Sequence, residues 1–445
     1  IRGVAGKFPL DRRTVQTIGE SLTRRFRERL GREPRFVSGR DTRESSAWIE
    51  DSFHAGAQSA HCESAGVITT PGVAFVTRAF DFDAGIVISA SHNPFDDNGI
   101  KIFSPTGKKI DEATERQIEN DIYEQQQEAG VVERTVDDSR SEEFRSAYLD
   151  YIAEEFNGLD LGRIKIVVDC AHGAASELAP RLFERFGAEV TAFNNRPDGR
   201  NINDNCGSMH LEFLQKKVVE KNADFGVAFD GDADRALFVD ENGKIIDGDG
   251  TLWIMAQYLQ DYGKLENKTV VATVMSNIGL EIALAQNGIR LDRTAVGDKY
   301  VLEELLKTGS EIGGEQSGHV IFPERSLVGD GMMTALHVLQ AVRERDVPFS
   351  EMMRGFTRYP QVLVNVKVRE KLPFESTPAI AAAARAVEND LDGKGRLLLR
   401  YSGTENLARV MIEGKDQTSI EEQANQLARI IESELGRTTS NGAAT

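Results

Sequence analysis

The sequence predicts an α/β protein of several domains, in which three related units are followed by a C-terminal unit of a different type. Short apolar strands alternate with longer helical patterns along most of the 445 residues, which is typical of parallel α/β units. The same layout occurs three times, and each time a polar loop marked by glycine follows a late strand. From residue 361 the stretch "QVLVNVKV" alternates, which indicates a half-exposed strand in an antiparallel or mixed sheet.

The strand order within the three units explains why their polar loops are expected to meet. In the first unit we expect strands near 35–39, 66–69 and 85–90, the last leading into "SHNP". In the second unit they lie in "RIKIVVDCAHGA", "AEVTAFN" and "FGVAFDGDADR", and in the third in "KTVVATVMSN", "IRLDRTAVGD" and "EIGGEQSGH". Open α/β sheets bind ligands at the carboxyl ends of their strands. Three similar domains would therefore direct these loops toward one place.

Four domains and a tail are predicted, because a chain of this length exceeds a single core. The approximate limits are 1–150, 151–248, 249–360 and 361–436, and the polar tail 437–445 is expected to be disordered. The last domain contains a hairpin-like strand pair in "RLLLRYSGTENLARVMIEG" and a closing helix that ends at Gly436. We expect Thr418 and Glu421 to form a capping box at its start. One face of this helix carries Ile420, Leu427, Ile431 and Leu435.

The charge balance excludes some classes of partner. Lys and Arg total 53 against 71 Asp and Glu, so the net charge is −18. Nucleic acid and an anionic membrane need a basic surface, and neither is expected as a partner. The three separated cysteines, Cys62, Cys170 and Cys206, fit a reducing compartment, and a cytoplasmic protein is expected. The chain opens at Ile1 without methionine, so we expect further residues to precede it.

Three aspartates after an apolar strand predict a metal site. Asp230, Asp232 and Asp234 occupy alternate positions in "DGDADR", and convergent carboxylates need a hard divalent cation to offset their repulsion. An EF-hand loop would need glycine where Arg235 stands and a helix where "ALFV" follows. A haloacid-dehalogenase-like phosphatase would use the first aspartate as nucleophile, and Asp234 weakens that match. A solvated acidic turn is the plain alternative.

The stretch "GIVISASHNPFDDNGIKI" places a hydroxyl at the end of a buried-looking strand. Ser91 is a candidate carrier of a phosphoryl group, and a cap or turn serine is the alternative. On an extended backbone Ser91 and His92 would point to opposite faces, so a nucleophile–base pair between them is not expected. Phosphoryl transfer needs no such pair, because it depends mostly on positioning and charge neutralisation.

Two further loops carry polar side chains suited to a sugar phosphate. In "IGGEQSGHVIF" the alternating Glu315, Ser317 and His319 are suited to hydrogen bonds with sugar hydroxyls, although plain turns often look similar. In "RYSGTENLAR" two arginines flank two hydroxyls and a glycine, which predicts a phosphate cradle; an ordinary hairpin turn is the alternative. The cradle residues are Arg400, Ser402, Gly403, Thr404 and Arg409. Further cations in or beside the loops are Arg2, Arg40, Arg43, Lys101, Arg235 and Lys299.

Together these motifs resemble those of the α-D-phosphohexomutase family. "SASHNP", "DGDADR", "GEQSGH" and "RYSGTEN" occur in the family's order, and the resemblance covers essentially the whole chain. It implies a heart-shaped, four-domain architecture with mixed sheets, in which three related α/β domains and a C-terminal α+β domain surround a central cleft. Two departures are the lack of residues before Ile1 that the family has and Asn406 where proline is common.

The resemblance also implies a role for each candidate residue. Ser91 would be the phosphorylated serine, and Asp230, Asp232 and Asp234, with a phosphoserine oxygen, would bind Mg²⁺. Arg2, His92, Lys101 and Arg235 would lie near the reacting phosphoryl group. Lys101 is the first choice as general acid/base, and it would need its pKa lowered by the cationic surroundings to act as a base near neutral pH; His92 is the alternative. Glu315, Ser317, His319 and Lys299 would bind the sugar, and the cradle residues would bind the distant phosphate.

Within the family, "GEQSGHVIF", "VGDKYV" and "YPQVLVNVKV" look most like the bacterial branch that acts on glucosamine phosphates. Phosphomannomutase/phosphoglucomutase relatives tend to have Met where Gln316 stands. The resemblance therefore implies interconversion of glucosamine 6-phosphate and glucosamine 1-phosphate, with Mg²⁺ and glucosamine 1,6-bisphosphate as activator and intermediate. The alternatives are a mannose- or glucose-phosphate mutase and, from another class, a metal-dependent sugar phosphatase. A homodimer is the assembly to be tested.

Overall fold

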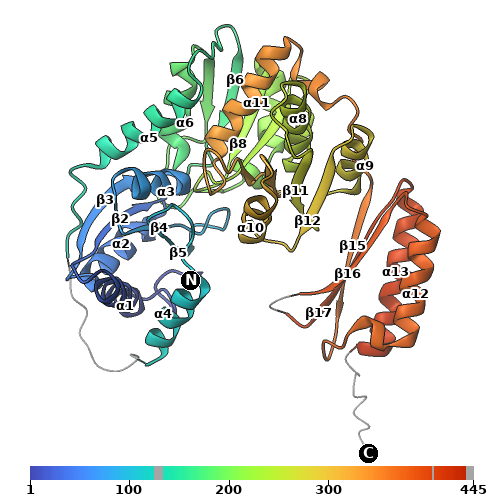
Figure 1. The fold of residues 1–445 in the computed structure, drawn as a ribbon, viewed down its shortest axis with the longest axis horizontal. Coiled ribbons are helices and arrows are strands. Elements are labelled where there is room, and N and C mark those ends of the chain that lie inside the picture. Colours follow the sequence, from blue (N-terminus) through green and yellow to red (C-terminus); the bar gives the residue numbers. More distant parts are fainter. Residues whose placement is uncertain (125–133, 403–404, 437–445) are drawn as a thin grey trace, which may run out of the picture. The chain divides into compact units, whose positions relative to one another are not determined.

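A computed structural model describes residues 1–124, 134–402 and 405–436 of the chain (Figure 1). The chain divides into two compact units. The first unit contains Ile1–Thr273 and Asp292–Arg354, and the second contains Val274–Leu291 and Gly355–Thr445. The expected disordered tail, 437–445, lies outside the described residues. Within the described residues, no helix combines the length and apolar character that crossing a bilayer requires.

The first sheet of the first unit is mixed and has five strands. Its order is β1-β5-β4-β2-β3, with β2 parallel to β3 and β4, and β5 antiparallel to β4 and β1. All five residues of β4 are buried, as expected for a strand inside a covered sheet. The strands are β1 (Arg2–Val4), β2 (Arg35–Arg40), β3 (His61–Val67), β4 (Ala84–Ile88) and β5 (Asp97–Phe103). The accompanying helices are α1 (Arg12–Leu30), α2 (Glu44–Gly56), α3 (Thr70–Ala79), α4 (Glu112–Glu124) and α5 (Ser141–Glu155).

The second sheet repeats the plan of the first. Its order is β10-β9-β8-β6-β7, with β6 parallel to β7 and β8, and β9 antiparallel to β8 and β10. The strands are β6 (Lys165–Asp169), β7 (Glu189–Phe193), β8 (Phe225–Phe229), β9 (Ala236–Asp240) and β10 (Ile245–Ile246). The helices are α6 (Ala175–Arg185) and α7 (Glu212–Lys221), with a short 3₁₀ turn η1 (Gly207–Met209). The prediction of related α/β domains with mixed sheets is confirmed here.

The third sheet continues the pattern with shorter strands. β11 (Thr269–Thr273) is parallel to β13 (Gly313–Gly314), which is antiparallel to β14 (Val320–Ile321). β12 (Arg290–Thr294) lies where the chain passes between the two units. The helices are α8 (Gly248–Asp261), α10 (Asp298–Thr308) and α11 (Gly331–Arg345), with the 3₁₀ turn η2 (Phe349–Met353).

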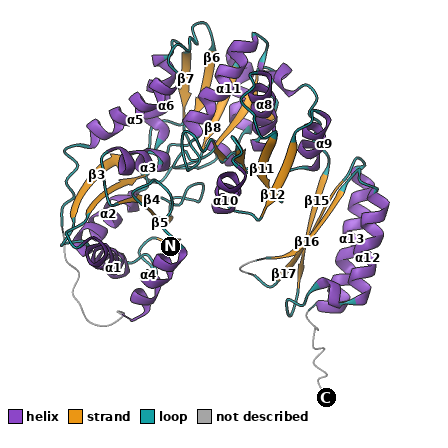
Figure 2. Ribbon diagram, viewed as in Figure 1, coloured by secondary structure: helices purple, strands orange, loops and turns teal. Residues whose placement is uncertain are grey.

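The second unit has the expected α+β fold. An antiparallel sheet of order β15-β17-β16 packs one face against α12 and α13 (Figure 2). Its elements are β15 (Gln361–Lys367), β16 (Arg396–Tyr401), β17 (Leu407–Glu413), α9 (Ile278–Gln286), η3 (Phe374–Ser376), α12 (Pro378–Leu391) and α13 (Gln417–Leu435). The predicted apolar face of α13 is confirmed, since Ile420, Leu427, Ile431 and Leu435 are all buried.

Two local predictions were wrong. The strand expected near 66–69 is β3, which runs from His61 to Val67 and continues directly into the turn before α3. The cap of α13 is Asp416, whose carboxylate accepts the Ser419 N–H at 2.7 Å, instead of the expected box formed by Thr418 and Glu421. An aspartate two residues before Thr418 accepts a free N–H of the first turn, so the helix begins at Gln417.

A buried histidine predicts how stability depends on pH. His337 on α11 packs its ring 4.7 Å from that of Phe156 and 4.1 Å from that of Phe322. Burial, with Arg325 and Lys264 nearby, lowers the pKa of His337 to about 3. The unfolded chain would bind a proton below about pH 6.5, whereas the folded chain would not. The neutral His337 ring therefore contributes fully to the free energy of unfolding above pH 6.5, and this contribution is lost as the pH falls toward 3.

Replacement of this ring tests the effect. We expect His337→Phe to keep the packing. Between pH 6.5 and 4.5 its free energy of unfolding should fall by about 2 kcal/mol less than that of the wild type. Urea unfolding at several pH values measures this difference. His61→Phe, at a side chain that is 63% exposed, is the control. An unchanged acid slope in His337→Phe would contradict the prediction.

Candidate active site

Three polar loops of the first unit meet, and each follows an equivalent strand. Ser91 comes after β4, Asp230 after β8 and Glu315 after β13, which hold corresponding places in their sheets. The Ser91 hydroxyl donates to the Asp230 carboxylate, and Ala236 N donates to Gly318 O at 3.1 Å. The expected meeting of the three loops therefore follows from the repeated strand order.

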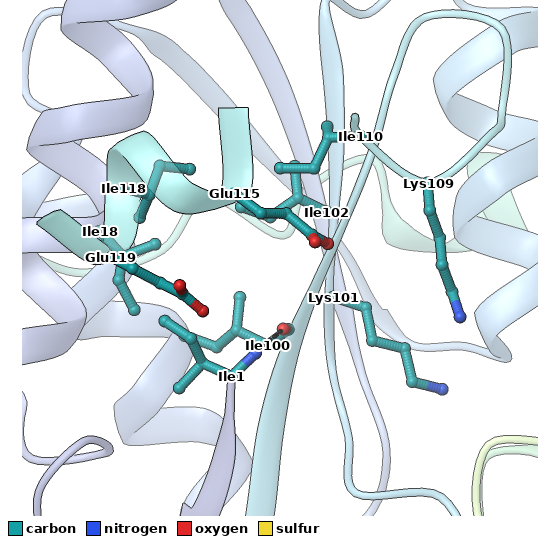
Figure 3. Close-up of a pocket in the computed structure, with 10 residues that line it drawn as sticks. All are labelled: Ile1, Ile18, Ile100, Lys101, Ile102, Lys109, Ile110, Glu115, Ile118 and Glu119. Atoms are coloured by element: carbon teal, nitrogen blue, oxygen red, sulfur yellow. Dashed lines mark hydrogen bonds between the residues drawn. The ribbon is translucent and has the colours of Figure 1, made fainter. Parts of the chain in front are cut away.

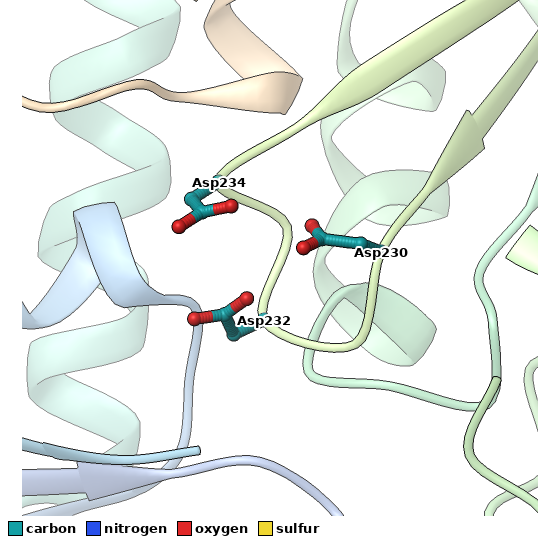
Figure 4. A group of neighbouring side chains, drawn as sticks. All are labelled: Asp230, Asp232 and Asp234. Atoms are coloured by element: carbon teal, nitrogen blue, oxygen red, sulfur yellow. The ribbon is translucent and has the colours of Figure 1, made fainter. Parts of the chain in front are cut away.

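The three aspartates of the second loop form a compact acidic group. Figure 4 shows Asp230, Asp232 and Asp234 with their carboxylates turned toward one another around the loop after β8. All three are buried, and one ligand oxygen from each lies within 4.8 Å of the others. Among the described residues, Asp232 Oδ1 and Asp234 Oδ1 have no hydrogen-bond partner. Buried carboxylate oxygens without partners fit a hard divalent cation such as Mg²⁺. β9 follows the loop, so the EF-hand alternative is excluded.

The pKa values of Asp230 and Asp234 are shifted in opposite directions. Burial raises the pKa of Asp230 well above its usual value, and Asp234 and Asp232 raise it further. Burial would also raise the pKa of Asp234, but the charges of Lys101, His319 and Arg235 outweigh it and hold that pKa well below its usual value. Without a cation, a negative charge on Asp230 is therefore less compensated than one on Asp234.

Lys101 contacts the aspartates from β5. Its Nζ lies 2.6 Å from Asp232 Oδ2 and 3.3 Å from Asp234 Oδ2. Burial alone would lower the pKa of Lys101, but these two carboxylates outweigh it and raise the pKa. The expectation of cationic surroundings that lower this pKa was wrong, because the nearest charges are carboxylates. Thr70 also contacts Asp232. Its N–H donates to Asp232 O at 2.9 Å, and its hydroxyl donates to the Asp232 carboxylate.

Ser91 lies in a turn, not on the extended backbone that the sequence predicts. Its φ is 54°, in the left-handed region, and its N–H donates to Ser89 Oγ at 2.9 Å. His92 contacts Arg235, with Nδ1 and Nη1 3.0 Å apart. Burial lowers the pKa of His92, and Arg235 and Arg2 lower it further. Within the described residues no hydrogen bond joins Ser91 to His92, so the two side chains have separate partners as expected.

The residues expected to bind the sugar are only partly brought together. Glu315 accepts the Gly297 N–H at 3.2 Å, and Ser317 is half-buried beside it. His319 is buried, with Nδ1 3.8 Å from Asp234 Oδ1 and Nε2 accepting the Gly329 N–H at 3.1 Å. The Lys299 ammonium is paired with the carboxylate of Glu112 on α4. In this conformation Lys299 therefore contacts another side chain of the protein at an exposed position.

The predicted phosphate cradle lies in the second unit. Arg400 on β16 and Arg409 on β17 are direct cross-strand partners, so two guanidinium groups share one face of the sheet. Burial lowers the pKa of Arg400, and the charge of Arg409 lowers it further. Among the described residues, the buried Arg409 Nε has no partner. Like charges side by side favour a bound anion. Ser402 is buried beside them, whereas Gly403 and Thr404 lie outside the described residues.

Lys101 is one of the residues that line a pocket of about 210 Å³ (Figure 3). Isoleucines from β5, α1 and α4 wall it, and Glu115 and Glu119 border it. Lys101 and Lys109 also line the pocket, but its isoleucine wall offers few hydrogen-bond partners for sugar hydroxyls, so the polar loops remain the candidate site. Sequence reasoning missed Thr70 and Asn203 and left Arg43 without a role. A side chain that acts on another segment's backbone has no spacing signal in one sequence.

Family models match nearly the whole chain. Those of phosphoglucomutase/phosphomannomutase alpha/beta/alpha domains I, II and III match residues 1–129, 146–243 and 247–359, and that of the C-terminal domain matches 363–430. The chain therefore belongs to the phosphoglucomutase/phosphomannomutase family, and the resemblance to phosphohexomutases is confirmed. It is an enzyme of the phosphohexomutase class.

Individual relatives agree with the family. The chain is 47% identical to the phosphoglucosamine mutase of Solibacter usitatus over 98% of both proteins, and 48% identical to that of Pelotomaculum thermopropionicum over 89% of both. A Burkholderia thailandensis phosphoglucomutase/phosphomannomutase family protein has a TM-score of 0.78, with 23% identity over 97% of this chain and 96% of that one. Aspergillus fumigatus N-acetylphosphoglucosamine mutase, solved with GlcNAc-6P and magnesium, has a TM-score of 0.62, with 19% identity over 82% of this chain and 93% of that one. The two solved structures support the fold.

Proposed function

We propose that the chain interconverts glucosamine 6-phosphate and glucosamine 1-phosphate through a phosphorylated Ser91 and glucosamine 1,6-bisphosphate. The observation that carries the site assignment is the hydrogen bond from Ser91 to Asp230, within a buried group of three aspartates. The names of the relatives and their identity over nearly full length support the substrate. The domain limits 1–150, 151–248, 249–360 and 361–436 are part of this proposal.

The residues divide the chemistry among them. Asp230, Asp232 and Asp234 would hold Mg²⁺, which would neutralise charge on the transferring phosphoryl group. In the first transfer, sugar O1 forms a bond to phosphorus while the bond from phosphorus to Ser91 Oγ breaks. The O1 proton passes to the general base, which is Lys101 in its neutral amine form or, as the alternative, His92, whose pKa is lowered by burial. In the second transfer, the bisphosphate in its reversed orientation returns its O6 phosphoryl group to Ser91, and a proton returns to O6.

Arg235 and Arg2 supply positive charge beside His92, next to the reacting serine. Glu315, Ser317, His319 and Lys299 are assigned to the sugar hydroxyls, and Lys299 would have to leave Glu112 to reach them. Arg400, Ser402, Gly403, Thr404 and Arg409 are assigned to the phosphate that does not react. Few sugar contacts and one phosphate cradle suit a site that accepts its ligand in two orientations.

The substrate is tested by comparing kcat/KM for glucosamine 6-phosphate, glucose 1-phosphate and mannose 1-phosphate with Mg²⁺ and the matching bisphosphate. Released phosphate is followed in parallel. We expect at least a tenfold preference for the amino sugar. Equal or reversed preference would favour a phosphomannomutase or phosphoglucomutase. Steady phosphate release without isomer would favour a metal-dependent sugar phosphatase instead.

Substitution of the cradle arginines should mainly weaken substrate binding. We expect Arg400→Ala or Arg409→Ala to weaken the free energy of substrate binding by roughly 1.5–3 kcal/mol, because each loses a charged hydrogen bond to phosphate. This loss should appear as a raised KM. Steady-state kinetics measures this change. Arg429→Ala, at an exposed position of α13, is the matched control. An unchanged KM in both cradle variants would remove this assignment.

A cytoplasmic location and a homodimer are further parts of the proposal. Cys62, Cys170 and Cys206 are all free and buried, which suits a reducing compartment. Light scattering of the purified protein tests the homodimer.

A further inference from the structure

Two side chains from different α/β domains hold the backbone of the loop that carries Ser91. Arg43, just before α2, donates from Nη2 to Ser91 O at 2.8 Å and to Asn93 O at 2.9 Å, and its Nη1 donates to Pro94 O. Asn203, in the loop after β7, donates from Nδ2 to Ser91 O at 2.9 Å and to Asn93 O at 3.1 Å. We call Arg43 and Asn203 the carbonyl clamp.

The clamp is rigid on the Arg43 side. The side chains of Arg43 and Asp41 are both 0% exposed, and Arg43 Nε lies 2.9 Å from Asp41 Oδ2. Asp41 Oδ1 also accepts from Ser46 Oγ at 2.8 Å and from Arg43 N at 3.1 Å. A buried ion pair carries a desolvation cost, and here every charged group has local partners that fix its orientation.

The clamp decides which way the peptide after Ser91 points. Ser91 has a left-handed φ of 54°, and both clamp residues contact its carbonyl oxygen. In a planar trans peptide the N–H of the next residue points opposite to that carbonyl. The His92 N–H is therefore directed away from the clamp, and among the described residues it has no acceptor. A backbone N–H next to a nucleophile is a common donor to an oxyanion.

We propose that Arg43 and Asn203 are positioning residues, which hold the Ser91 carbonyl so that the His92 N–H binds the phosphoryl group on Ser91. This inference rests on the proposed function. The N–H would stabilise charge on a phosphoryl oxygen as the bond from phosphorus to Ser91 Oγ breaks and the bond to the sugar oxygen forms. Removal of the clamp should therefore slow transfer more than it weakens sugar binding.

Asn203→Gly tests the clamp with little backbone strain. Asn203 has a φ of 58°, which glycine adopts freely, so only the amide contacts are lost. Asn222→Gly is the matched control, because Asn222 has a φ of 47° at the end of α7, far along the chain from the Ser91 loop. Arg43→Lys is the second variant; it keeps the charge beside Asp41 but lacks the planar fork that reaches three carbonyls.

The measurement is single-turnover transfer of labelled phosphate from pre-phosphorylated enzyme to glucosamine 6-phosphate with Mg²⁺. We expect Asn203→Gly and Arg43→Lys to slow transfer ten- to a hundredfold, with sugar-phosphate KM within about threefold of wild type. Asn222→Gly should transfer at the wild-type rate. A wild-type rate in Asn203→Gly, or an equal loss in Asn222→Gly, would overturn the clamp alone. Failure of the wild-type phosphoenzyme to transfer at all would instead overturn the proposed function.

Discussion

Ser91→Ala should lower mutase turnover by on the order of 10³-fold or more, because in the proposed reaction the Ser91 hydroxyl carries the phosphoryl group between the two transfers. The fold should persist, although Asp230 loses a buried hydrogen bond and stability falls by about 1–2 kcal/mol. Turnover is measured with glucosamine 6-phosphate and added bisphosphate, and intact-protein mass spectrometry reports the phosphorylated form.

The control for this variant is Ser52→Ala. Ser52 is also buried, but its hydroxyl donates to Trp48 O within α2, away from the polar loops. The Ser52→Ala variant should keep normal turnover and should still show the phosphorylated form. Near-normal turnover in Ser91→Ala, or a phosphorylated form that persists in it, would show that another residue carries the phosphoryl group.

Asp230→Asn should have opposite effects on stability with and without Mg²⁺. Three buried carboxylates repel one another, and a charge on Asp230 is less compensated than one on Asp234, so neutralisation of Asp230 should raise Tm by several degrees when a chelator is present. With excess Mg²⁺ the wild type gains binding energy, about 2.7 kcal/mol at a hundred times Kd, and the variant loses most of this gain. Turnover should fall at least about a hundredfold.

Thermal melts of both proteins in chelator and in Mg²⁺ make the comparison. Asp261→Asn, at a side chain that is 61% exposed, should shift Tm little in either condition. If Mg²⁺ stabilised Asp230→Asn as much as wild type, Asp230 would not be a metal ligand. If the chelator left wild-type turnover intact, the triad would have no catalytic role.

Local patterns in the sequence were enough for the fold class and for the family. The alternation of strands and helices, and the same polar loop after a late strand, reflect interactions between residues close in the chain. The sequence therefore predicts three related domains, and the equal strand orders of the first two sheets explain why Ser91 and Asp230 leave equivalent strands. The four motifs then identified the family that the domain models match.

Other features depended on residues that are distant in the chain. The hydrogen bond from Ser91 to Asp230 spans 139 residues, and that from Asn203 to Ser91 O spans 112. Lys101 was predicted among cations but contacts Asp232 and Asp234, because the register of β5 against β4 sets where its side chain emerges. Gly231 illustrates the same point: a Cβ there would lie 2.5 Å from Ser91 O, so this close approach requires glycine.

The sequence by itself determined which chemical groups this protein has and roughly where along the fold they lie. Residue type and short spacing suffice for an acidic loop suited to a metal ion, a serine after a buried strand and a pair of arginines across a hairpin. Only the tertiary structure decided the left-handed backbone of Ser91, the charges around Lys101 and the carbonyl clamp. The physical reason is that orientation and pKa depend on burial and on charges a few ångströms away, and the packing of whole domains sets both.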